Sequence, residues 1–480
     1  MDFNSAGLKK LGFFRYRQLN GSGYILTNEV GDYCLLDSGS LDLLLSGDLQ
    51  RLTSQKYDEL RNFGIIRDRH SLDRLARKFA SKNYFLERGT SLHIVVVTLR
   101  CDHKCTYCQS NSRGLREKQF DMDKETARCV VDRIFESPNR DIIIEFQGGE
   151  PLVNLETLKF IVEYAKDKNV RANKNLAITI VSNLSFMNKQ ILRYFMDNDV
   201  AVCTSLDGPE HVHNRNRVAS GARNSHRNTV KWIKTINAEY KKHKLYHRMN
   251  SLATLTKFSL KYPREIVDEY VRLGFKEMHL RPVSPFGNSR RLWRKLGYPA
   301  DGFIGFYKKA MDYIIELNLK GNAFLERTAA VFLKKIITDR DPNFLDLRSP
   351  CGAVIGQLAY YVNGDVYTCD EGRMLASMGD DNFKVGNVFE HTFRDFFDNP
   401  VTKAMCVASY LDDLPGCSDC AYNPYCGICP LYNYFAEGNI FSQAANSRTC
   451  RINSAVLDYI FEKLQDKRIR EEVFLKWVER

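Results

Sequence analysis

The 480-residue sequence lacks any long apolar run. Its longest strand-like apolar stretch covers only residues 94–97, far short of the roughly 18 residues that a membrane-spanning helix needs. The first fourteen residues carry Lys9 and Lys10 with no apolar core behind them, so they do not resemble a secretion signal. Proline- or serine-rich linkers and internal repeats are also missing. We therefore expect a cytoplasmic protein with no membrane partner.

The composition excludes wholesale disorder, because 44% of the residues are hydrophobic and 27% are charged, as in ordinary folded proteins. The formal net charge of +12 is spread along the chain. An excess of this size permits an acidic partner, but it does not require a nucleic acid. We expect no nucleic-acid partner.

The middle of the chain alternates apolar strands with amphipathic stretches of helical length. We expect strands at residues 92–99, 142–146, 176–181, 200–206, 249–255 and 277–283, with helices between them. Such repeated β/α units predict parallel strands, in a barrel or in an open doubly wound sheet. In both folds, reactive groups lie on the loops that follow the carboxyl ends of the strands.

The two ends of the chain have different patterns. Three short strands within residues 14–36, separated at Asn20–Gly21 and at residues 28–31, precede helices near 38–45, 54–63 and 72–79. This order predicts a small winged-helix-like module. Helices at 303–319 and 324–338 bridge to a segment beyond Pro350 where cysteines gather, as in a small domain held by metal. A last helix is expected at about 455–478. The expected domains are residues 1–88, 89–300, 301–345 and 346–480.

Ten of the fourteen cysteines fall into two groups with the spacing of metal ligands. Without an export signal, disulfides are not expected. Of the four remaining cysteines, Cys34, Cys129 and Cys203 are expected to be buried apolar residues, and Cys406 lies near the second group. The first group, Cys101, Cys105 and Cys108, directly follows the first expected strand of the sheet. Structural zinc requires four ligands, whereas three thiolates on a tight loop suit a 4Fe–4S cluster with one open iron.

The three-cysteine spacing, with Tyr107 before the last cysteine, resembles the signature of the radical SAM superfamily. The sequence Gln147-Gly-Gly-Glu-Pro151 is similar to the family motif that contacts the amino group of S-adenosylmethionine. Ser182-Asn183 and Ser205-Leu-Asp207 follow the next two strands, as in the family. The resemblance implies a 4Fe–4S cluster on Cys101, Cys105 and Cys108. It also implies that S-adenosylmethionine contacts Tyr107, Gln109, Gly148, Gly149, Glu150, Ser182, Asn183, Ser205, Asp207, Arg217 and Leu280.

The second cysteine group resembles the SPASM domain, which carries auxiliary Fe–S clusters. The resemblance implies one auxiliary cluster on Cys417, Cys420, Cys426 and Cys450, and another on Cys351, Cys369 and Cys429. Only two residues separate Cys426 from Cys429, where the family usually has three. Seven cysteines leave the second auxiliary cluster one cysteine short, with Cys406, Asp341 or Asp346 as possible further ligands. The alternative for Cys417–Cys450 is a zinc ribbon.

Asp370 directly follows Cys369, as in sulfatase-maturating relatives that use this aspartate as a base; the alternative is a turn-capping residue.

Taken together, the chain resembles radical SAM/SPASM peptide maturases, and most of all the B-type maturase of the His-Xaa-Ser system. The resemblance implies an oxidoreductase that abstracts a hydrogen from a ribosomally made peptide and oxidises it, forming a crosslink. It implies S-adenosylmethionine and three Fe–S clusters, a precursor peptide whose leader binds the N-terminal module, a flavodoxin or ferredoxin donor, and a paired second maturase. One alternative is an anaerobic sulfatase-maturating enzyme that forms formylglycine. Alternatives of another class are a non-catalytic Fe–S electron carrier and a zinc-based RNA-binding module. His243 and His247 have the spacing of a zinc pair, but no third ligand is indicated and a solvated basic turn is expected.

Overall fold

The computed structural model describes residues 4–19, 23–67, 69–222, 224–245 and 249–479. The expected turn at Asn20–Gly21 and His247 lie outside these residues. The chain divides into two compact units. The first unit comprises residues 1–87, 328–351 and 408–480, and the second comprises residues 88–327 and 352–407.

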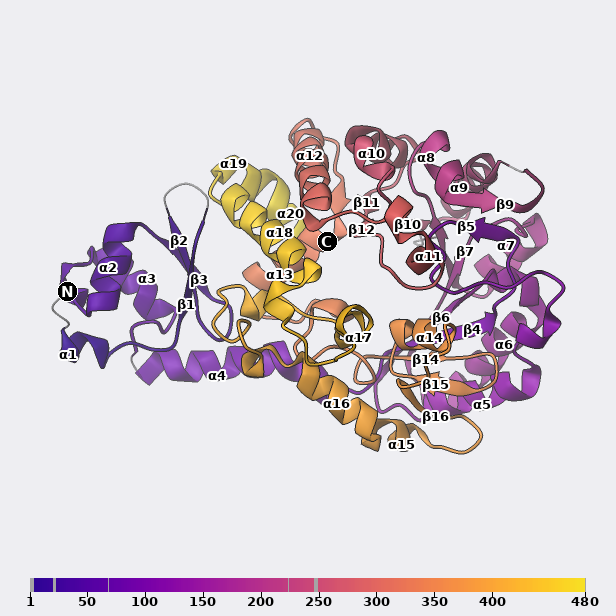
Figure 1. Ribbon diagram of the computed structural model, residues 1–480, viewed down its shortest axis with the longest axis horizontal. Helices are drawn as coiled ribbons and strands as arrows, with labels where there is room; N and C mark the ends of the chain where they lie inside the picture. Colours follow the sequence, from indigo (N-terminus) through magenta and orange to yellow (C-terminus); the bar gives the residue numbers. More distant parts are fainter. Residues whose placement is uncertain (1–3, 20–22, 68, 223, 246–248, 480) are drawn as a thin grey trace. The chain divides into compact units, whose positions relative to one another are not determined.

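The second unit is built on a nine-stranded sheet with the order β12-β10-β8-β7-β6-β4-β14-β15-β16 (Figure 1). Its first six strands are parallel. They are β4 (Leu92–Thr98), β6 (Asp141–Gly148), β7 (Asn175–Ser182), β8 (Val200–Ser205), β10 (Asn250–Leu255) and β12 (Leu280–Pro282). The prediction of an α/β fold with parallel strands is confirmed.

Helices connect consecutive parallel strands, as the amphipathic pattern predicts. They include α5 (Lys124–Phe135), α6 (Leu155–Ala172), α7 (Lys189–Asp197), α9 (Ser225–Lys242) and α10 (Pro263–Arg272). In α5, the Asp123 side chain accepts a hydrogen bond from the Thr126 N–H at 2.7 Å, a cap typically worth about 1 kcal/mol. The helix then buries Ala127, Val130 and Ile134 at the spacing of one helical face.

The sheet extends further than the sequence pattern indicates. β14 (Gln357–Tyr360) lies parallel to β4, and β15 (Asp365–Tyr367) and β16 (Lys384–Asn387) continue the edge in antiparallel pairing. These residues were expected in a separate metal-held segment. All four residues of β14 are buried, so this short strand has no alternation from which to recognise it. The sixth expected strand is split at His279 into β11 (Glu277–Met278), which pairs with β13 (Leu325–Glu326), and β12.

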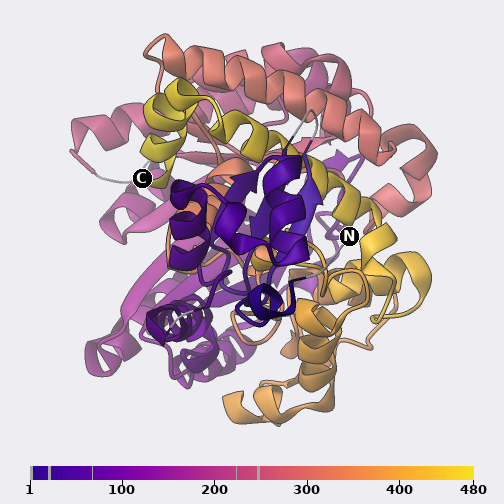
Figure 2. The same ribbon diagram turned by 90° about the vertical axis from the view of Figure 1, so that its left-hand side faces the viewer.

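The first unit begins with an antiparallel sheet of order β1-β2-β3, made of β1 (Arg15–Gln18), β2 (Tyr24–Thr27) and β3 (Tyr33–Leu36). The helices α2 (Ser38–Ser46), α3 (Ser54–Asn62) and α4 (Arg69–Asn83) follow. Leu26, Leu36, Leu44, Leu60 and Ile65 form the centre of a common core. Figure 2 shows these elements in indigo, facing the viewer.

The same unit contains α13 (Arg327–Ile337), nearly all of which lies within it, α17 (Pro430–Glu437), α18 (Arg448–Leu464), α19 (Lys467–Ile469) and α20 (Leu475–Val478). The expected last helix therefore ends at Leu464, and Asp466 caps α19. The N-terminal sheet packs on this part of the chain, since Tyr33 and Phe461 form a ring pair at 5.1 Å and the Tyr425 hydroxyl donates to the Gly31 carbonyl at 3.0 Å. Residues 1–87 therefore share a core with residues 408–480.

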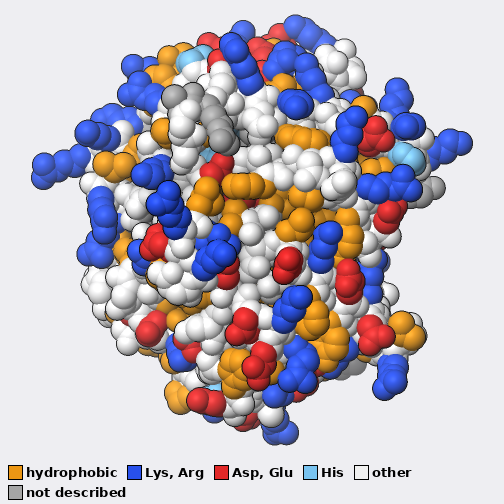
Figure 3. Space-filling model, turned by 90° about the vertical axis from the view of Figure 1, so that its right-hand side faces the viewer, with side chains coloured by type: hydrophobic (Ala, Val, Ile, Leu, Met, Phe, Trp, Pro, Cys, Tyr) orange, Lys and Arg blue, Asp and Glu red, His pale blue; other side chains and the backbone are white. Residues whose placement is uncertain are grey.

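The face of the molecule drawn in Figure 3 carries charges of both signs. On the face in Figure 3, lysine and arginine side chains project around the rim, with acidic and hydrophobic side chains between them. The net charge of +12 is thus not gathered into one patch on this face. Within the described part of the chain, no helix has both the length and the apolar character to cross a membrane.

Candidate active site

A cavity in the second unit opens at the carboxyl ends of the parallel strands, where the fold predicts reactive groups. Segments that follow β4, β6, β7 and β8 line it, together with residues of β10, β12 and α14 (Asp370–Ala376). The sequence-predicted residues among its lining are Cys101, Cys105, Tyr107, Cys108, Gln109, Gly148, Gly149, Ser182, Asn183, Ser205, Arg217 and Asp370. The chain therefore brings twelve of these residues to one cavity.

The three cysteines of the first group line this cavity on the loop after β4. Within the loop, β5 (His103–Cys105) pairs with β9 (Arg217–Ala219), placing Cys105 opposite Arg217. Burial raises the pKa of Cys101 well above its ordinary value, and the nearby Cys105 and Cys108 thiols raise it further. Burial raises the pKa of Cys105 to about 12, although Arg217 lowers it. Three neighbouring thiols beside a cationic guanidinium fit a cluster whose iron binds thiolates.

The turn after β6 brings the backbone close to this cysteine loop. The N–H of Gly149 donates to the Thr98 carbonyl at 2.9 Å, and that of Glu150 donates to Arg100 at 2.8 Å. A β-carbon at Gly149 would lie 2.4 Å from the Leu99 and Arg100 carbonyl oxygens, and Gly148 has a φ of 130°. Only glycines permit this approach, and their open backbone faces the cavity.

Glu150 is buried behind the turn and does not line the cavity. Its carboxylate accepts hydrogen bonds from the Ser182 hydroxyl and from the Asn183 N–H, both at 2.7 Å, and from the Leu152 N–H at 3.1 Å. Burial raises the pKa of Glu150 to about 7, while the bonds from Ser182 and Asn183 lower it. In this structure Glu150 ties the ends of β6 and β7 together.

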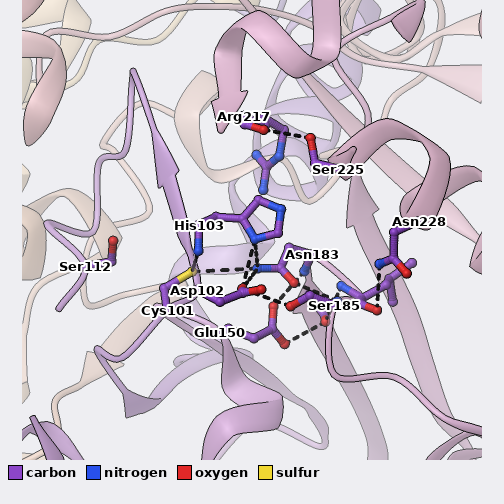
Figure 4. Close-up of polar contacts among 12 residues, drawn as sticks. Cys101, Asp102, His103, Ser112, Glu150, Asn183, Ser185, Arg217, Ser225 and Asn228 are labelled. Atoms are coloured by element: carbon purple, nitrogen blue, oxygen red, sulfur yellow. Dashed lines mark hydrogen bonds and ion pairs between the residues drawn. The ribbon is translucent and has the colours of Figure 1, made fainter. Parts of the chain in front are cut away.

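Asn183 joins the end of β7 to the cysteine loop (Figure 4). Its amide nitrogen lies 2.9 Å from His103 Nδ1, 3.1 Å from Asp102 Oδ1 and 3.6 Å from Cys101 Sγ. The Ser185 hydroxyl also donates to Asp102, at 2.9 Å. Asp102 and His103 were missed by the sequence analysis. The available signal was an aspartate–histidine pair inside the cysteine motif.

Tyr107 connects the cysteine loop to the end of β8. Its hydroxyl lies 2.9 Å from both carboxylate oxygens of Asp207, and Arg217 donates to the same hydroxyl at 2.8 Å. Burial raises the pKa values of Tyr107 and Asp207. Asp207 is fully buried and lies behind the lining, while Arg217 reaches the cavity. Leu280 is 1% exposed and also lies behind the lining; its neighbour Arg281 lines the cavity instead.

The wall formed by α14 carries a second polar network. The fully buried Arg373 donates to Asp370 Oδ1 from Nε at 2.7 Å and to Gln147 Oε1 at 3.2 Å. Gln147 in turn donates to Glu145 at 2.6 Å. Burial raises the pKa of Glu145, and the charge of Asp370 raises it further. Asp370 therefore lies in the cavity wall with its carboxylate held in place.

The second group of cysteines is divided between the two units. Cys369 belongs to the second unit, and Cys351, Cys417, Cys420, Cys426, Cys429 and Cys450 belong to the first. Burial raises the pKa of Cys417 to about 12, and Cys426, Cys450 and Cys420 raise it further. These four thiols are therefore neighbours, and none forms a disulfide. Four neighbouring thiols fit an Fe–S cluster, which is larger than a single metal ion. Among the described residues, these thiols do not form a group close enough to share one ion.

The remaining candidates have structural partners. Asp341 pairs with Arg348, with its Oδ2 3.0 Å from the guanidinium Nε. Cys406 lies on α16 (Pro400–Ser409), in the second unit. His243 lies 3.6 Å from Glu239, one helical turn away. His247 lies outside the described residues.

The fold and the cavity define an α/β enzyme with three thiols gathered at the carboxyl edge of a parallel sheet. Residues 95–247 match the family model of the Radical SAM superfamily. The chain is thus an enzyme with a radical SAM domain at these residues.

Individual relatives extend this likeness over most of the chain. The sequence is 25% identical over 346 residues to the cysteine-type anaerobic sulfatase-maturating enzyme of Clostridium novyi (strain NT), covering 71% of this chain and 87% of that enzyme. It is 26% identical over 198 residues to the radical SAM cyclopropyl synthase TigE of Paramaledivibacter caminithermalis, covering 38% and 40% of the two chains.

Two solved structures share the fold. Native anSMEcpe with bound AdoMet has a TM-score of 0.64 at 21% identity, covering 78% of this chain and 98% of that one. Streptococcus suis SuiB bound to precursor peptide SuiA has a TM-score of 0.54 at 14% identity, covering 91% and 98%. At these identities the likeness shows the fold alone.

Proposed function

We propose that this enzyme oxidises a side chain of a ribosomally made peptide, as a radical SAM/SPASM maturase of the B-type His-Xaa-Ser kind. The observation that carries the proposal is the cavity, which combines three thiols with an acidic wall at Asp370. When bound, the cluster and S-adenosylmethionine supply the 5′-deoxyadenosyl radical that abstracts the hydrogen atom. The names of the relatives, a sulfatase-maturating enzyme and SuiB with its precursor peptide, support a peptide substrate.

The chain's own residues bind the cofactor and position the substrate. Cys101, Cys105 and Cys108 hold the cluster, the glycine turn at 148–149 offers its backbone, and Asn183 and Arg217 offer polar hydrogen atoms to the cofactor. Asp207 and Glu150 act from behind this lining, since each is buried and hydrogen-bonded to it. Tyr107 belongs to the lining and holds Asp207 through its hydroxyl. The remaining proposed contacts are Gln109, Ser182 and Ser205, which line the cavity, and Leu280, which lies behind the lining.

Asp370 is proposed to accept the proton that leaves the substrate radical, because it is the carboxylate in the cavity wall. Overall the substrate would lose two hydrogen atoms. The bound cofactors would supply the radical that takes the first, and Asp370 would accept the proton of the second, whose electron an auxiliary cluster would take up. Cys417, Cys420, Cys426 and Cys450 are proposed to hold one auxiliary cluster. Cys351, Cys369 and Cys429 are proposed to hold the other. A flavodoxin or ferredoxin supplies the reducing electron.

The N-terminal module is proposed to bind the leader peptide by adding a strand at β3. The strand order leaves β3 as a sheet edge, and edges are the places where peptides pair. The Leu35 carbonyl points outward, because it accepts a hydrogen bond from Lys56 Nζ at 2.8 Å. The fold likeness to SuiB covers 91% of this chain and the likeness to anSMEcpe covers 78%. The greater coverage supports a peptide maturase over the formylglycine-forming type.

The deciding experiment uses the anaerobically reconstituted enzyme with dithionite, S-adenosylmethionine and the short peptides encoded beside its gene. We expect 5′-deoxyadenosine together with a peptide that has lost two hydrogens and gained a bond between residues, assigned by tandem mass spectrometry. A formylglycine product would instead select the sulfatase-maturating alternative. Absence of 5′-deoxyadenosine would contradict the proposal as a whole.

A further inference from the structure

A pocket in the first unit lies apart from the residues proposed to bind the leader strand. Its walls come from the β2–β3 turn, the end of α4, the end of α13, the loop at residues 340–349 and the loops at 410–412 and 423–426. All of these segments belong to the same unit. The pocket is therefore built within one compact body.

The pocket contains more basic groups than its acids can neutralise. Lys82, Lys335, Arg340 and Arg348 face three acids. Two of those acids are already paired: Asp341 with Arg348, and Asp412 with Arg15 at 2.7 Å. The third, Glu29, is exposed at the rim. An anion entering the pocket would thus compete chiefly with Glu29 at the rim, because the other two acids already have basic partners.

Lys82 is the clearest unpaired charge. Its ammonium donates to the Lys335 backbone carbonyl at 3.0 Å, and among the described residues it forms no ion pair. Burial lowers the pKa of Lys82 to about 7, and the nearby ammonium groups of Lys78 and Lys335 lower it further, while the charges of Asp32 and Asp339 raise it. Lys78 is paired with Asp32 at 2.6 Å and with Asp339 at 2.9 Å. A half-buried ammonium bonded only to a carbonyl is poorly compensated, and a carboxylate would supply the missing charge.

Apolar groups surround this charge. Val30, Phe79, Phe85 and Pro424 line the pocket. Phe79 is 48% exposed, and Leu72, seven residues earlier on α4, is 53% exposed. Residues seven apart lie on one face of a helix, so an apolar stripe leads along α4 to Lys82. A peptide that places an apolar side chain on Phe79 and an acidic one at Lys82 would match both features.

We propose that this pocket binds an acidic side chain of the peptide substrate, with Lys82 as the group that receives the carboxylate. The inference rests on the proposed function, since it takes the ligand to be the maturase's peptide. It adds a second anchor point, separate from the β3 edge, that selects peptides carrying an aspartate or glutamate beside an apolar residue.

The test measures binding of a defined probe to the reconstituted holoenzyme without S-adenosylmethionine, so that no turnover is needed. The probe is N-acetyl-4-fluorophenylalanyl-glutamyl amide, its uncharged counterpart carries glutamine, and binding is followed by ligand-observed fluorine NMR. We expect the glutamyl probe to bind at least tenfold more tightly, which corresponds to about 1.4 kcal/mol. Lys82→Met should abolish this preference, whereas Lys82→Arg should retain it.

Lys467→Met is the matched control, because Lys467 is an exposed lysine of the same unit; it should leave the preference intact. The ligand-free Lys82→Met protein should melt at or above the wild-type temperature, since it loses an uncompensated charge. A lower melting temperature would make Lys82 structural and overturn the proposal. Equal binding of the two probes would overturn it, as would displacement of the glutamyl probe by acetate at concentrations equal to the probe's own Kd. Failure of SAM cleavage would contradict the proposed function while leaving the probe preference unchanged.

Discussion

The Tyr107 hydroxyl lies 2.9 Å from both carboxylate oxygens of Asp207, with the Arg217 guanidinium donating to it from the other side at 2.8 Å. Tyr107 and Asp207 are buried, while Arg217 reaches the cavity. The two buried groups therefore depend on each other and on Arg217 for compensation of their polarity. This contact fastens the cysteine loop to the ends of β8 and β9.

Tyr107→Phe should therefore weaken the site without removing a thiol. Loss of the hydroxyl leaves Asp207 and Arg217 short of a buried partner, at a cost of about 1–3 kcal/mol. We expect a lower melting temperature and a Kd for S-adenosylmethionine raised about tenfold, measured by calorimetry. Tyr164→Phe removes a hydroxyl bonded to Asp132 at 2.9 Å, in the same unit but on the helix layer, and should leave the Kd unchanged. An unaltered Kd in Tyr107→Phe would contradict the coupling.

Removing the first cysteine group should leave the iron bound by the second group in place. Replacing Cys101, Cys105 and Cys108 with alanine should abolish formation of 5′-deoxyadenosine, because the cluster loses its only thiolates. Iron bound by the second cysteine group should persist, as measured by iron analysis and EPR. Cys129→Ala, on α5, serves as the control and should retain activity. Continued SAM cleavage by the triple variant would disprove the assignment.

Glu150 should make stability depend on pH. Burial raises its pKa from 4.5 to about 7. Between pH 4.5 and about 7, Glu150 is therefore protonated in the native state and ionised in the unfolded state. Its contribution is fully present below about pH 4.5 and is lost as the pH rises through about 7. The total change is about 3 kcal/mol.

The measurement compares anaerobic melting temperatures of wild type and Glu150→Gln from pH 5 to 8. Glutamine does not titrate, so the advantage of wild type over the variant should shrink as the pH rises. A difference that grew with pH, or stayed constant, would show that Glu150 is ionised throughout. Because other titrating groups are common to both proteins, they cancel in the difference.

Asp370→Asn should uncouple SAM cleavage from product formation. Asparagine cannot take up the substrate's proton, so peptide product should fall by at least tenfold while 5′-deoxyadenosine persists. The variant also leaves Arg373 without its charged partner, and its melting temperature must be recorded for this reason. Asp395→Asn, which alters the cap of α15 (Phe393–Asp398), controls for destabilisation alone. Equal loss of both products would favour a structural role for Asp370.

Leu35→Pro should test strand addition at β3. Because the Leu35 carbonyl faces outward, its N–H does too, and proline removes that donor while leaving the pairing with β2. We expect leader-peptide affinity to fall at least tenfold relative to Leu35→Ala, with SAM cleavage unchanged. This is cleaner than deleting residues 13–86, which would strip partners from Tyr425 and Phe461. Equal affinity in the two variants would place the leader elsewhere.

The sequence by itself determined the parallel strands, most of their helices and the three-thiol loop. These follow from periodicities and spacings within about twenty residues, such as the α5 face that buries Ala127, Val130 and Ile134. Strand β14 was missed because its four residues are all buried and show no alternation. Its pairing with β4 and β15 identifies it.

Tertiary structure alone decided which polar groups face the cavity. Asn183 meets Asp102 across 81 residues, and Arg373 meets Gln147 across 226. The positions of the Glu150 and Asp207 carboxylates behind the lining also depend on hydrogen-bond partners from other strands. The module at residues 1–87 looked independent because its local pattern is self-contained, yet its sheet packs on α18. Such contacts arise from the burial of surfaces that are distant in sequence, and no local pattern of residues indicates which surfaces will pack together.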